Sequence, residues 1–168
     1  MSTTPDAGLP GMDDNPAMAR DVIDSNRYLV LGTVDDDGRP RVSPVYFTHT
    51  DHVDFYWVSS PDSHHSRNLA ARPRVSFVVF DSSVTPAEDP RAVYVDADAT
   101  EVAEADLEAE CARAFARPRG DGARPFAPEE LSGDADLRLY RARASRHQVH
   151  VRGRNHPSGI DARETVRP

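Results

Sequence analysis

The chain has 168 residues, enough for one domain with a buried core, and its formal net charge of -8 comes from 28 acidic and 20 basic residues. All of these basic residues are arginines. An acidic surface repels the phosphates of nucleic acids and anionic membrane faces, so the composition disfavours both as partners and leaves a small molecule or another protein.

Cys111 is the single cysteine, which excludes a disulfide or a thiolate metal cluster within one chain and fits a reducing compartment. The first 16 residues lack the basic start and apolar core of a secretory signal, and no segment approaches the roughly 20 apolar residues of a membrane span. We therefore expect a cytoplasmic protein in which residues 1–14, rich in Pro, Gly and Asp, form a disordered tail.

The rest of the chain predicts mostly strands. Residues 15–25 are expected to form a short helix, because Pro16 lies near its start and apolar residues share one face. Runs rich in β-branched and aromatic residues predict strands over 28–34, 39–48, 53–60, 74–80 and 91–102, and the last long strand over 137–151. Residues 104–117 predict an amphipathic helix, and 152–168 a loop or tail.

Turn residues separate the first three strands. Asp-Asp-Asp-Gly at 35–38 is typical of a hairpin turn, and residues 49–52 are expected to close a second hairpin. Since no crossover helices separate these strands, the pattern indicates a mainly β, antiparallel small barrel with peripheral helices rather than a doubly wound sheet.

The segment SSPDSHHSRN at 59–68 offers two interpretations. A strand ends in serines, a Pro-Asp turn follows, and a helix begins near Ser63. The unpaired N–H groups of a helix start attract a phosphate, and hydroxyl and cationic side chains assist them. The other interpretation is that Asp62 or Ser63 only caps the helix and the basic side chains are solvated. The residues available to such an anion pocket are Ser59, Ser60, Ser63, His64, His65 and Arg67.

No metal site is expected. His64 and His65 are adjacent on a helix and point about 100° apart, which suits a shared ion poorly. His49 and His52, like His147 and His150, are three residues apart, and in an extended strand such a pair points to opposite faces. Motifs of a serine nucleophile, a P-loop or a dinucleotide-binding turn are also absent, and Cys111 is expected to be buried and inert.

Three stretches in order carry a family resemblance: LVLGTVDDDGRPRVSPVYFT, VDFYWVSSPDSHHSRNLAARPRVSFVVFD and RAVYVDADATEV. Together they resemble the pyridoxamine 5'-phosphate oxidase-like family of flavin-binding split barrels, over roughly residues 24–151. The resemblance implies a six-stranded antiparallel split β-barrel over residues 15–151. It also implies a homodimer with FMN between the subunits.

The same resemblance implies a set of cofactor contacts. The strand of Arg41, Val42, Ser43, Pro44, Val45 and Tyr46 would line the flavin ring and ribityl chain with its backbone, and Val58 and Ser59 would contact the ribityl phosphate. His64 and His65 stand where the oxidases carry Arg-Lys as a phosphate clamp. Two permanent positive charges are thus replaced by side chains whose charge depends on pH, and Arg67 is expected to compensate with a permanent charge of its own. Ala92 stands at the position of a ring-binding glutamine. Ser60, Ser63 and Asn68 complete the expected set.

Two departures from the oxidases argue against vitamin B6 as the substrate. Tyr46 stands where they place a lysine, and their arginine-histidine pair near the C-terminus has no clear match. The resemblance therefore implies an FMN-dependent oxidoreductase that transfers hydride to or from an unidentified small molecule. A deazaflavin-dependent reductase and a non-enzymatic flavin- or haem-binding barrel remain as alternatives. No catalytic acid or base is assigned, and Tyr46 and His49 are the nearest candidates.

Overall fold

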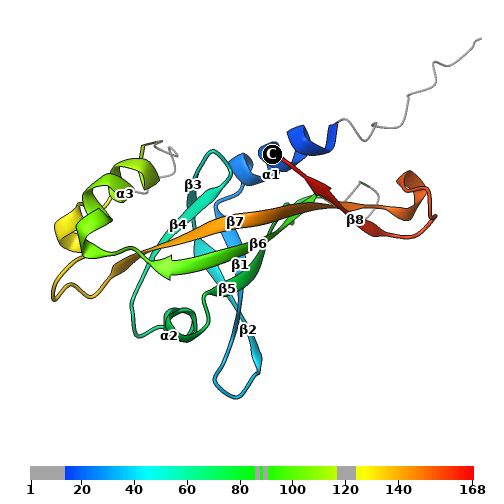
Figure 1. Ribbon diagram of the computed structural model, residues 1–168. Helices are drawn as coiled ribbons and strands as arrows, with labels where there is room; N and C mark the ends of the chain where they lie inside the picture. The colour runs from blue at the N-terminus through cyan, green and yellow to red at the C-terminus, as the bar shows by residue number, and fades with distance from the viewer. Residues whose placement is uncertain (1–13, 86–87, 89–90, 117–123) are drawn as a thin grey trace, which may run out of the picture.

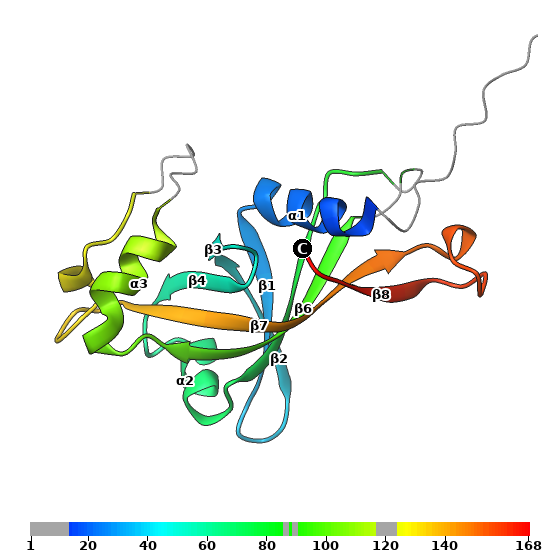
Figure 2. The same ribbon diagram turned by 45° about the horizontal axis from the view of Figure 1, so that its top comes forward.

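The computed structural model describes residues 14–85, 88, 91–116 and 124–168 (Figure 1). The strands are β1 (Tyr28–Val34), β2 (Pro40–Tyr46), β3 (Thr48–Thr50), β4 (Asp54–Ser59), β5 (Arg74–Phe80), β6 (Ala92–Glu101), β7 (Arg138–Val151) and β8 (Ala162–Val166). They form one antiparallel sheet in the order β2-β1-β5-β6-β7-β4-β3, with β8 paired to β7. The sheet curls into a half-open barrel, most clearly seen in Figure 2. The predicted mainly β, antiparallel fold is confirmed.

Three α-helices lie around the sheet in the described residues: α1 (Asn15–Ser25), α2 (His64–Ala71) and α3 (Leu107–Ala114). Short 3-10 turns occupy Glu104–Asp106, Pro128–Glu130 and Gly153–Asn155. Figure 1 shows α2 at the opposite end of the barrel from α1 and the hairpin of β3 and β4. None of the helices in the described parts of the chain is long and apolar enough to cross a membrane.

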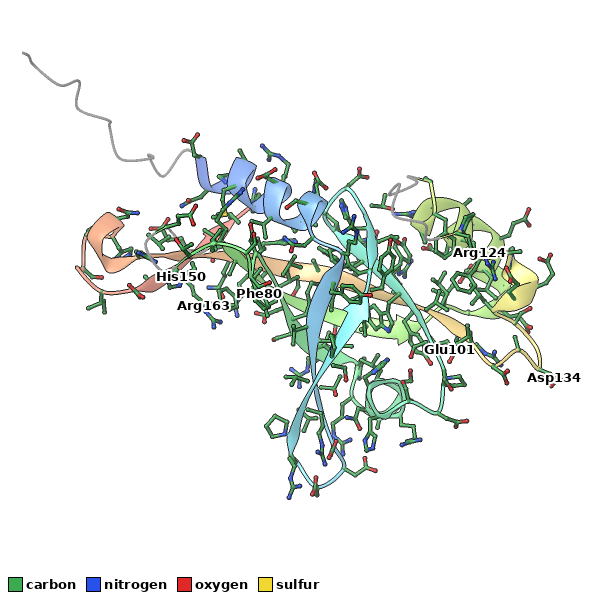
Figure 3. The ribbon with its side chains drawn as sticks, turned by 180° about the vertical axis from the view of Figure 1, so that it is seen from behind. Phe80, Glu101, Arg124, Asp134, His150 and Arg163 are labelled. Atoms are coloured by element: carbon green, nitrogen blue, oxygen red, sulfur yellow. The ribbon has the colours of Figure 1, made fainter. Side chains whose placement is uncertain are left out.

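Two strands exceed the six that the sequence predicts. The run expected over 39–48 divides at Phe47, which is fully buried and whose N–H donates to the Arg27 carbonyl, so β3 forms separately from β2. The C-terminal residues 162–166 form β8 instead of a loop or tail. Arg163 lies on β8 (Figure 3), which pairs with β7. Its guanidinium carbon also lies 3.6 Å from the ring centroid of Tyr94 on β6, which adds a cation–π contact between β8 and the strand beyond β7. Of the tail predicted for residues 1–14, all but Asp14 lie outside the described residues.

Strand β4 is buried on both faces, because two hydrophobic clusters meet at it. Phe55 and Trp57 point into the main core inside the barrel, while Tyr56 packs in a second cluster beneath α3 with Leu107, Cys111, Leu131 and Leu139. Cys111 is buried, as the sequence predicts, and burial raises the pKa of its thiol.

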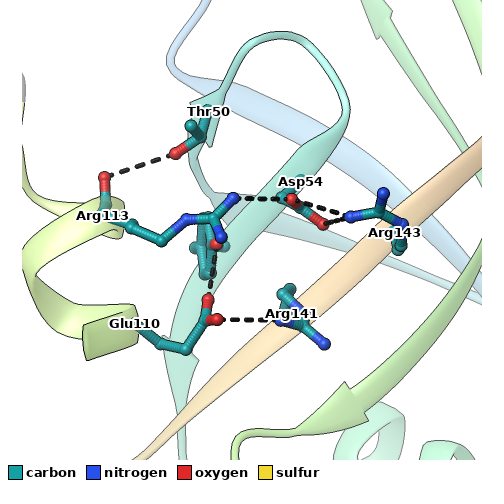
Figure 4. Close-up of polar contacts among 7 residues, drawn as sticks. Thr50, Asp54, Glu110, Arg113, Arg141 and Arg143 are labelled. Atoms are coloured by element: carbon teal, nitrogen blue, oxygen red, sulfur yellow. Dashed lines mark hydrogen bonds and ion pairs between the residues drawn. The ribbon is translucent and has the colours of Figure 1, made fainter. Parts of the chain in front are cut away.

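A group of charged side chains ties α3 to the sheet (Figure 4). Asp54 is 3% exposed and accepts hydrogen bonds from Arg113 of α3 at 3.0 Å and from Arg143 of β7 at 3.2 Å. Glu110 of α3 reaches β4 and β7 in the same way. Burial of carboxylates is tolerated here because each has cationic or hydroxyl partners.

Both predicted turns are confirmed. In the first hairpin the Gly38 N–H donates to the Asp35 carbonyl at 3.0 Å, and Gly38 has a φ of 82° that L-residues rarely adopt. In the second, the Val53 N–H donates to the Thr50 carbonyl at 3.0 Å, and Asp51 and His52 have φ angles of 52° and 57°. Two consecutive left-handed residues are the geometry of a type I′ hairpin turn.

Candidate anion site at the start of α2

The site begins where β4 ends and α2 starts. Ser63 is the N-cap of α2, and its hydroxyl accepts a hydrogen bond from the Ser66 N–H at 3.3 Å. Ser60 shapes the turn before it, because its carbonyl accepts from the Ser63 N–H and its hydroxyl from the Asp62 N–H. Ser63 therefore caps α2, which is compatible with both interpretations of this segment. The first N–H groups of α2 point out of the helix with no partner inside it.

Three serine hydroxyls and one imidazole converge on this first turn. Ser59 donates to Ser63 at 3.3 Å, Ser63 donates to Ser66 at 2.8 Å, and the His65 Nε2 lies 3.0 Å from the Ser59 hydroxyl. His65 is half-buried, and burial lowers its pKa, so the ring favours the neutral form. We refer to Ser59, Ser63, His65 and Ser66 as the serine cluster. Ser66 was missed from the sequence, although its position three residues after the N-cap is where a capping side chain meets the backbone.

A second network joins α2 to the first hairpin. The buried Asn68 amide donates to Thr33 at 3.0 Å and to Asp35 at 3.2 Å, and Arg41 donates to the other oxygen of Asp35 at 2.7 Å. The hydrogen bond from Arg41 is the main cause that lowers the pKa of Asp35, with further contributions from Asn68 and the charge of His64. Arg41, His64 and Asn68 thus lie around Asp35, and Thr33 holds Asn68 in place. Neither Thr33 nor Asp35 was predicted from the sequence as a site residue.

Arg67 is exposed and turns back on the segment before the helix, where its guanidinium donates to the Asp62 carbonyl. It therefore lies beside the first turn of α2 but outside the serine cluster. His64 is also exposed, whereas the Val58 side chain is half-buried and packs against the cluster under α3.

The predicted β2 residues divide between the two faces of the strand. Arg41, Ser43 and Val45 pair with Thr33, Leu31 and Leu29, the inward residues of β1, and Val45 is part of the core. Its side chain is therefore unavailable to a ligand, although the backbone of β2 stays accessible because β2 is the last strand at one edge of the sheet.

The outward residues of β1 and β2 are all apolar or tyrosine. We call them the outer hairpin face: Tyr28, Val30, Gly32, Val34, Pro40, Val42, Pro44 and Tyr46. Val42 is 74% exposed and Tyr28 59%, and Tyr28 packs edge-to-face on Tyr46 with 5.8 Å between ring centroids. Exposed apolar residues gathered on one face are a common feature of binding surfaces.

Ala92 lies far from the serine cluster within one chain. Ala92 pairs with Phe80 at one end of the β5–β6 ladder. Arg74, which follows α2 in the chain, pairs with Asp98 at the other end. The two ends are six residues apart along each strand, which is roughly 20 Å. In the antiparallel β1–β5 pair, Val78 lies opposite Val30, so Phe80 lies at the level of Tyr28. Tyr28 in turn pairs with Tyr46 on β2. Ala92 therefore shares the outward side of the sheet and the level of Tyr46, and not the phosphate end of the expected site.

The expectation that His49 and His52 point to opposite faces is wrong. Strand β3 ends at Thr50, and the left-handed angles of Asp51 and His52 turn the His52 ring back onto His49. Their rings stack with centroids 4.6 Å apart, at the other end of β4 from α2. His49 is thus remote from the serine cluster, and its assignment as a catalytic candidate gains no support from position.

A half-open antiparallel barrel with a capped helix following its fourth strand defines a protein of the split-barrel class. Residues 16–153 match the family model described as pyridoxamine 5'-phosphate oxidase. The chain belongs to this family, as the sequence motifs predicted. Comparison with curated proteins gives no significant match.

Solved structures with this fold include proteins with different ligands. A heme-binding protein from Mycobacterium smegmatis is 19% identical with a TM-score of 0.65, over 98% of this chain and 60% of that one. The heme storage protein HutZ from Vibrio cholerae is 22% identical with a TM-score of 0.54, over 75% and 87%. A FAD-binding protein from Mesorhizobium loti is also 22% identical, with a TM-score of 0.57 over 78% and 90%. At these identities the likeness establishes the fold alone.

Proposed function

We propose that this protein binds FMN, with the flavin phosphate at the start of α2, and acts as an oxidoreductase on a small molecule in the cytoplasm. The observation that carries the proposal is the serine cluster on the first turn of α2. Flavin, when bound, supplies hydride transfer at its N5 atom. The chain's own residues would hold and orient the cofactor.

The residues at α2 fit a phosphate group. The Ser59, Ser63 and Ser66 hydroxyls bond to one another. The half-buried Ser59 and Ser63 hydroxyls can rotate to donate to a phosphate oxygen instead, whereas Ser66 is 4% exposed and supports Ser63 from inside. The N–H groups of the first helical turn add donors and a partial positive charge. His65 can donate from its Nε2 in either protonation state.

Permanent positive charge would come from the edge of the cluster. Arg41 is engaged with Asp35 at 2.7 Å, so its charge is partly neutralised. Arg67 is exposed and its guanidinium donates to the Asp62 carbonyl, a neutral acceptor. Rotation of the guanidinium toward a phosphate would exchange this neutral acceptor for a charged one. We therefore propose Arg67 as the main cationic contact of the phosphate.

The outer hairpin face supports a homodimer with the flavin at its interface. It presents exposed apolar side chains on the edge strand β2 and its neighbour β1, and covering Val42 and Tyr28 by a second copy would remove them from water. Ala92 and Tyr46 lie on the same side of the sheet, but Ala92 is only 9% exposed in the single chain, so a partner that packs here would cover mainly Tyr46. In this arrangement the two ends of the flavin would meet different subunits, which accounts for the distance between Ala92 and the serine cluster.

Titration of the apo-protein with FMN at pH 6 and pH 8, followed by flavin fluorescence, tests the proposal. We expect saturable binding that Ser63→Ala and Arg67→Ala each weaken about tenfold, the loss of roughly 1.4 kcal/mol. The control is Ser83→Ala, since the Ser83 hydroxyl bonds Asp81 in the loop after β5, and this variant should bind as the wild type does. No saturable binding at either pH would refute the flavin proposal. Binding that Arg67→Ala leaves unchanged would refute the role of Arg67.

Haem is the second candidate ligand, because two of the similar structures are described as heme-binding or heme storage proteins. Adding hemin to the same apo-protein distinguishes the two, since a bound haem gives an intense Soret band and a bound flavin does not. A Soret band at one haem per chain, together with no FMN binding, would favour haem.

A further inference from the structure

Three potential metal ligands from separate parts of the chain converge at the end of the barrel opposite α2. Asp24 lies in the last turn of α1, His49 in β3 and His52 in the turn that follows. The Nε2 atoms of His49 and His52 lie 2.9 Å and 3.0 Å from the same oxygen, Oδ1 of Asp24. One ligand atom from each residue lies within 4.8 Å of the other two.

Two imidazole nitrogens and one carboxylate oxygen suit a zinc-like ion. Zn²⁺ takes His and Asp ligands in tetrahedral geometry, and sites with three protein ligands leave the fourth position to water. Ligand atoms about 2.05 Å from a tetrahedral ion are about 3.3 Å apart. The 2.9 Å and 3.0 Å separations between Asp24 and the two rings differ from this by only a few tenths of an ångström, and the third pair, the two imidazole nitrogens, lies within 4.8 Å. Entry of the ion would therefore move the Asp24 carboxylate slightly outward and rotate the stacked rings so that both nitrogens face the ion. Ca²⁺ and Mg²⁺ prefer oxygen ligands and suit the site less well.

The two imidazoles are held in place by the fold. The His49 side chain is 5% exposed and the His52 side chain 14%. His49 lies opposite Phe55 in the β3–β4 pair and near the Phe47 ring. The His52 carbonyl accepts a hydrogen bond from the His147 Nε2 at 2.8 Å, which fixes the turn from the side of β7. A site whose ligands are fixed before binding loses little entropy when the ion enters.

Asp24 forms the open side of the site. Its side chain is 49% exposed, so an ion would have access to solvent there and a free position for water. The residue also belongs to α1, whose Ala19, Val22 and Ile23 pack into the main core. An ion bound to all three residues would link α1 to the hairpin of β3 and β4.

We propose that Asp24, His49 and His52 form a binding site for Zn²⁺ or a similar divalent transition metal, separate from the serine cluster. Strand β4 lies between them, and its six residues separate the two by about 17 Å. The proposal does not depend on flavin binding. The same geometry without an ion would be a carboxylate that accepts hydrogen bonds from two imidazoles, and metal binding distinguishes these two states.

Isothermal titration of Zn²⁺ into the full chain, made without a histidine tag and stripped with EDTA, tests the proposal. We expect one saturable site per chain, and a visible absorption band from Co²⁺ at the same stoichiometry. Asp24→Asn and His52→Asn should each weaken Zn²⁺ binding at least tenfold. Asparagine adopts left-handed backbone angles readily, so His52→Asn keeps the turn.

Asp21→Asn is the matched control. Asp21 lies on the same helix and is also exposed, but its carboxylate pairs with Arg91 and not with histidine. This variant should bind Zn²⁺ as the wild type does. At one fixed concentration, Zn²⁺ should raise the Tm of the wild type and of Asp21→Asn more than that of Asp24→Asn, because the stabilisation grows with the affinity for the folded state. No saturable binding, or equal affinity in Asp24→Asn, His52→Asn and Asp21→Asn, would overturn the proposal.

Discussion

The contact between Tyr56 and Glu110 gives the sharpest prediction for stability. Tyr56 on β4 is 1% exposed, and its hydroxyl donates to Oε2 of Glu110 on α3 at 2.7 Å. The other oxygen of Glu110, which is 8% exposed, accepts from Arg141 at 2.9 Å. Burial is the main cause that raises the pKa of Tyr56, and the adjacent Glu110 carboxylate raises it further. The hydroxyl therefore stays protonated and donates at any ordinary pH.

Tyr56→Phe keeps the ring and removes this donor. A hydrogen bond to a charged group contributes about 1.5–3 kcal/mol to stability, and the loss is felt in full because the Glu110 oxygen remains buried. We therefore expect the free energy of unfolding to fall by about 1.5–3 kcal/mol. At about 2–4 °C per kcal/mol for a chain of this length, the Tm should drop by roughly 3–12 °C.

Urea unfolding followed by the fluorescence of Trp57, the one tryptophan and a buried one, measures the effect at fixed protein concentration. Ser83→Ala is the control, since it removes an exposed hydroxyl that bonds Asp81, and this variant should differ from the wild type by less than about 0.5 kcal/mol. The double variant with Glu110→Gln should show coupling of about 1 kcal/mol or more. A Tyr56→Phe variant within about 0.5 kcal/mol of the wild type, or effects that simply add, would refute the reasoning.

Three further predictions concern the barrel and α2. Gly32→Ala should lower the free energy of unfolding in urea by about 1–3 kcal/mol, because a Cβ would lie 2.9 Å from the Ser76 carbonyl oxygen across the β1–β5 pair. A variant as stable as the wild type would mean that β1 and β5 can move apart there without cost. Burial lowers the pKa of His65, so near pH 6.5 the unfolded chain binds more protons than the folded chain. The free energy of unfolding should therefore fall as the pH falls from 7.5 to 5.5, and His65→Gln should reduce this dependence. A pH dependence that His65→Gln leaves unchanged would contradict the lowered pKa of His65. Asn68→Ala should cost about 1–3 kcal/mol and speed amide exchange in α2, since Asn68 is buried and donates to Thr33 and Asp35; protection equal to that of the wild type would count against this network.

Most of the fold was predictable because its signals are local. Alternating apolar residues gave the main strands, Gly38 at the end of an aspartate run gave the first turn, and a serine before a helical pattern gave the cap at Ser63. Strand β8 was not predictable in the same way, because only Val166 of its five residues is buried and the strand depends on pairing with β7.

The site was harder to predict because its contacts cross between distant elements. Thr33 and Asp35 lie more than 30 positions from Asn68, and nothing in the local pattern indicates their hydrogen bonds to it. The level of Ala92 with Tyr46 follows from the strand register alone. His49 and His52 were misplaced because the strand period was applied through a turn whose residues have left-handed angles, and Asp24 joins them only when α1 packs on the sheet.

The affinity ratio between FMN and riboflavin tests the central claim most directly, because the two ligands differ only in the phosphate that we assign to the start of α2. We expect the wild-type apo-protein to bind FMN at least about tenfold more tightly than riboflavin at pH 7, a preference of roughly 1.4 kcal/mol or more. Ser63→Ala should reduce this preference and leave riboflavin binding unchanged. Equal affinities for FMN and riboflavin in the wild type would contradict a phosphate site at α2.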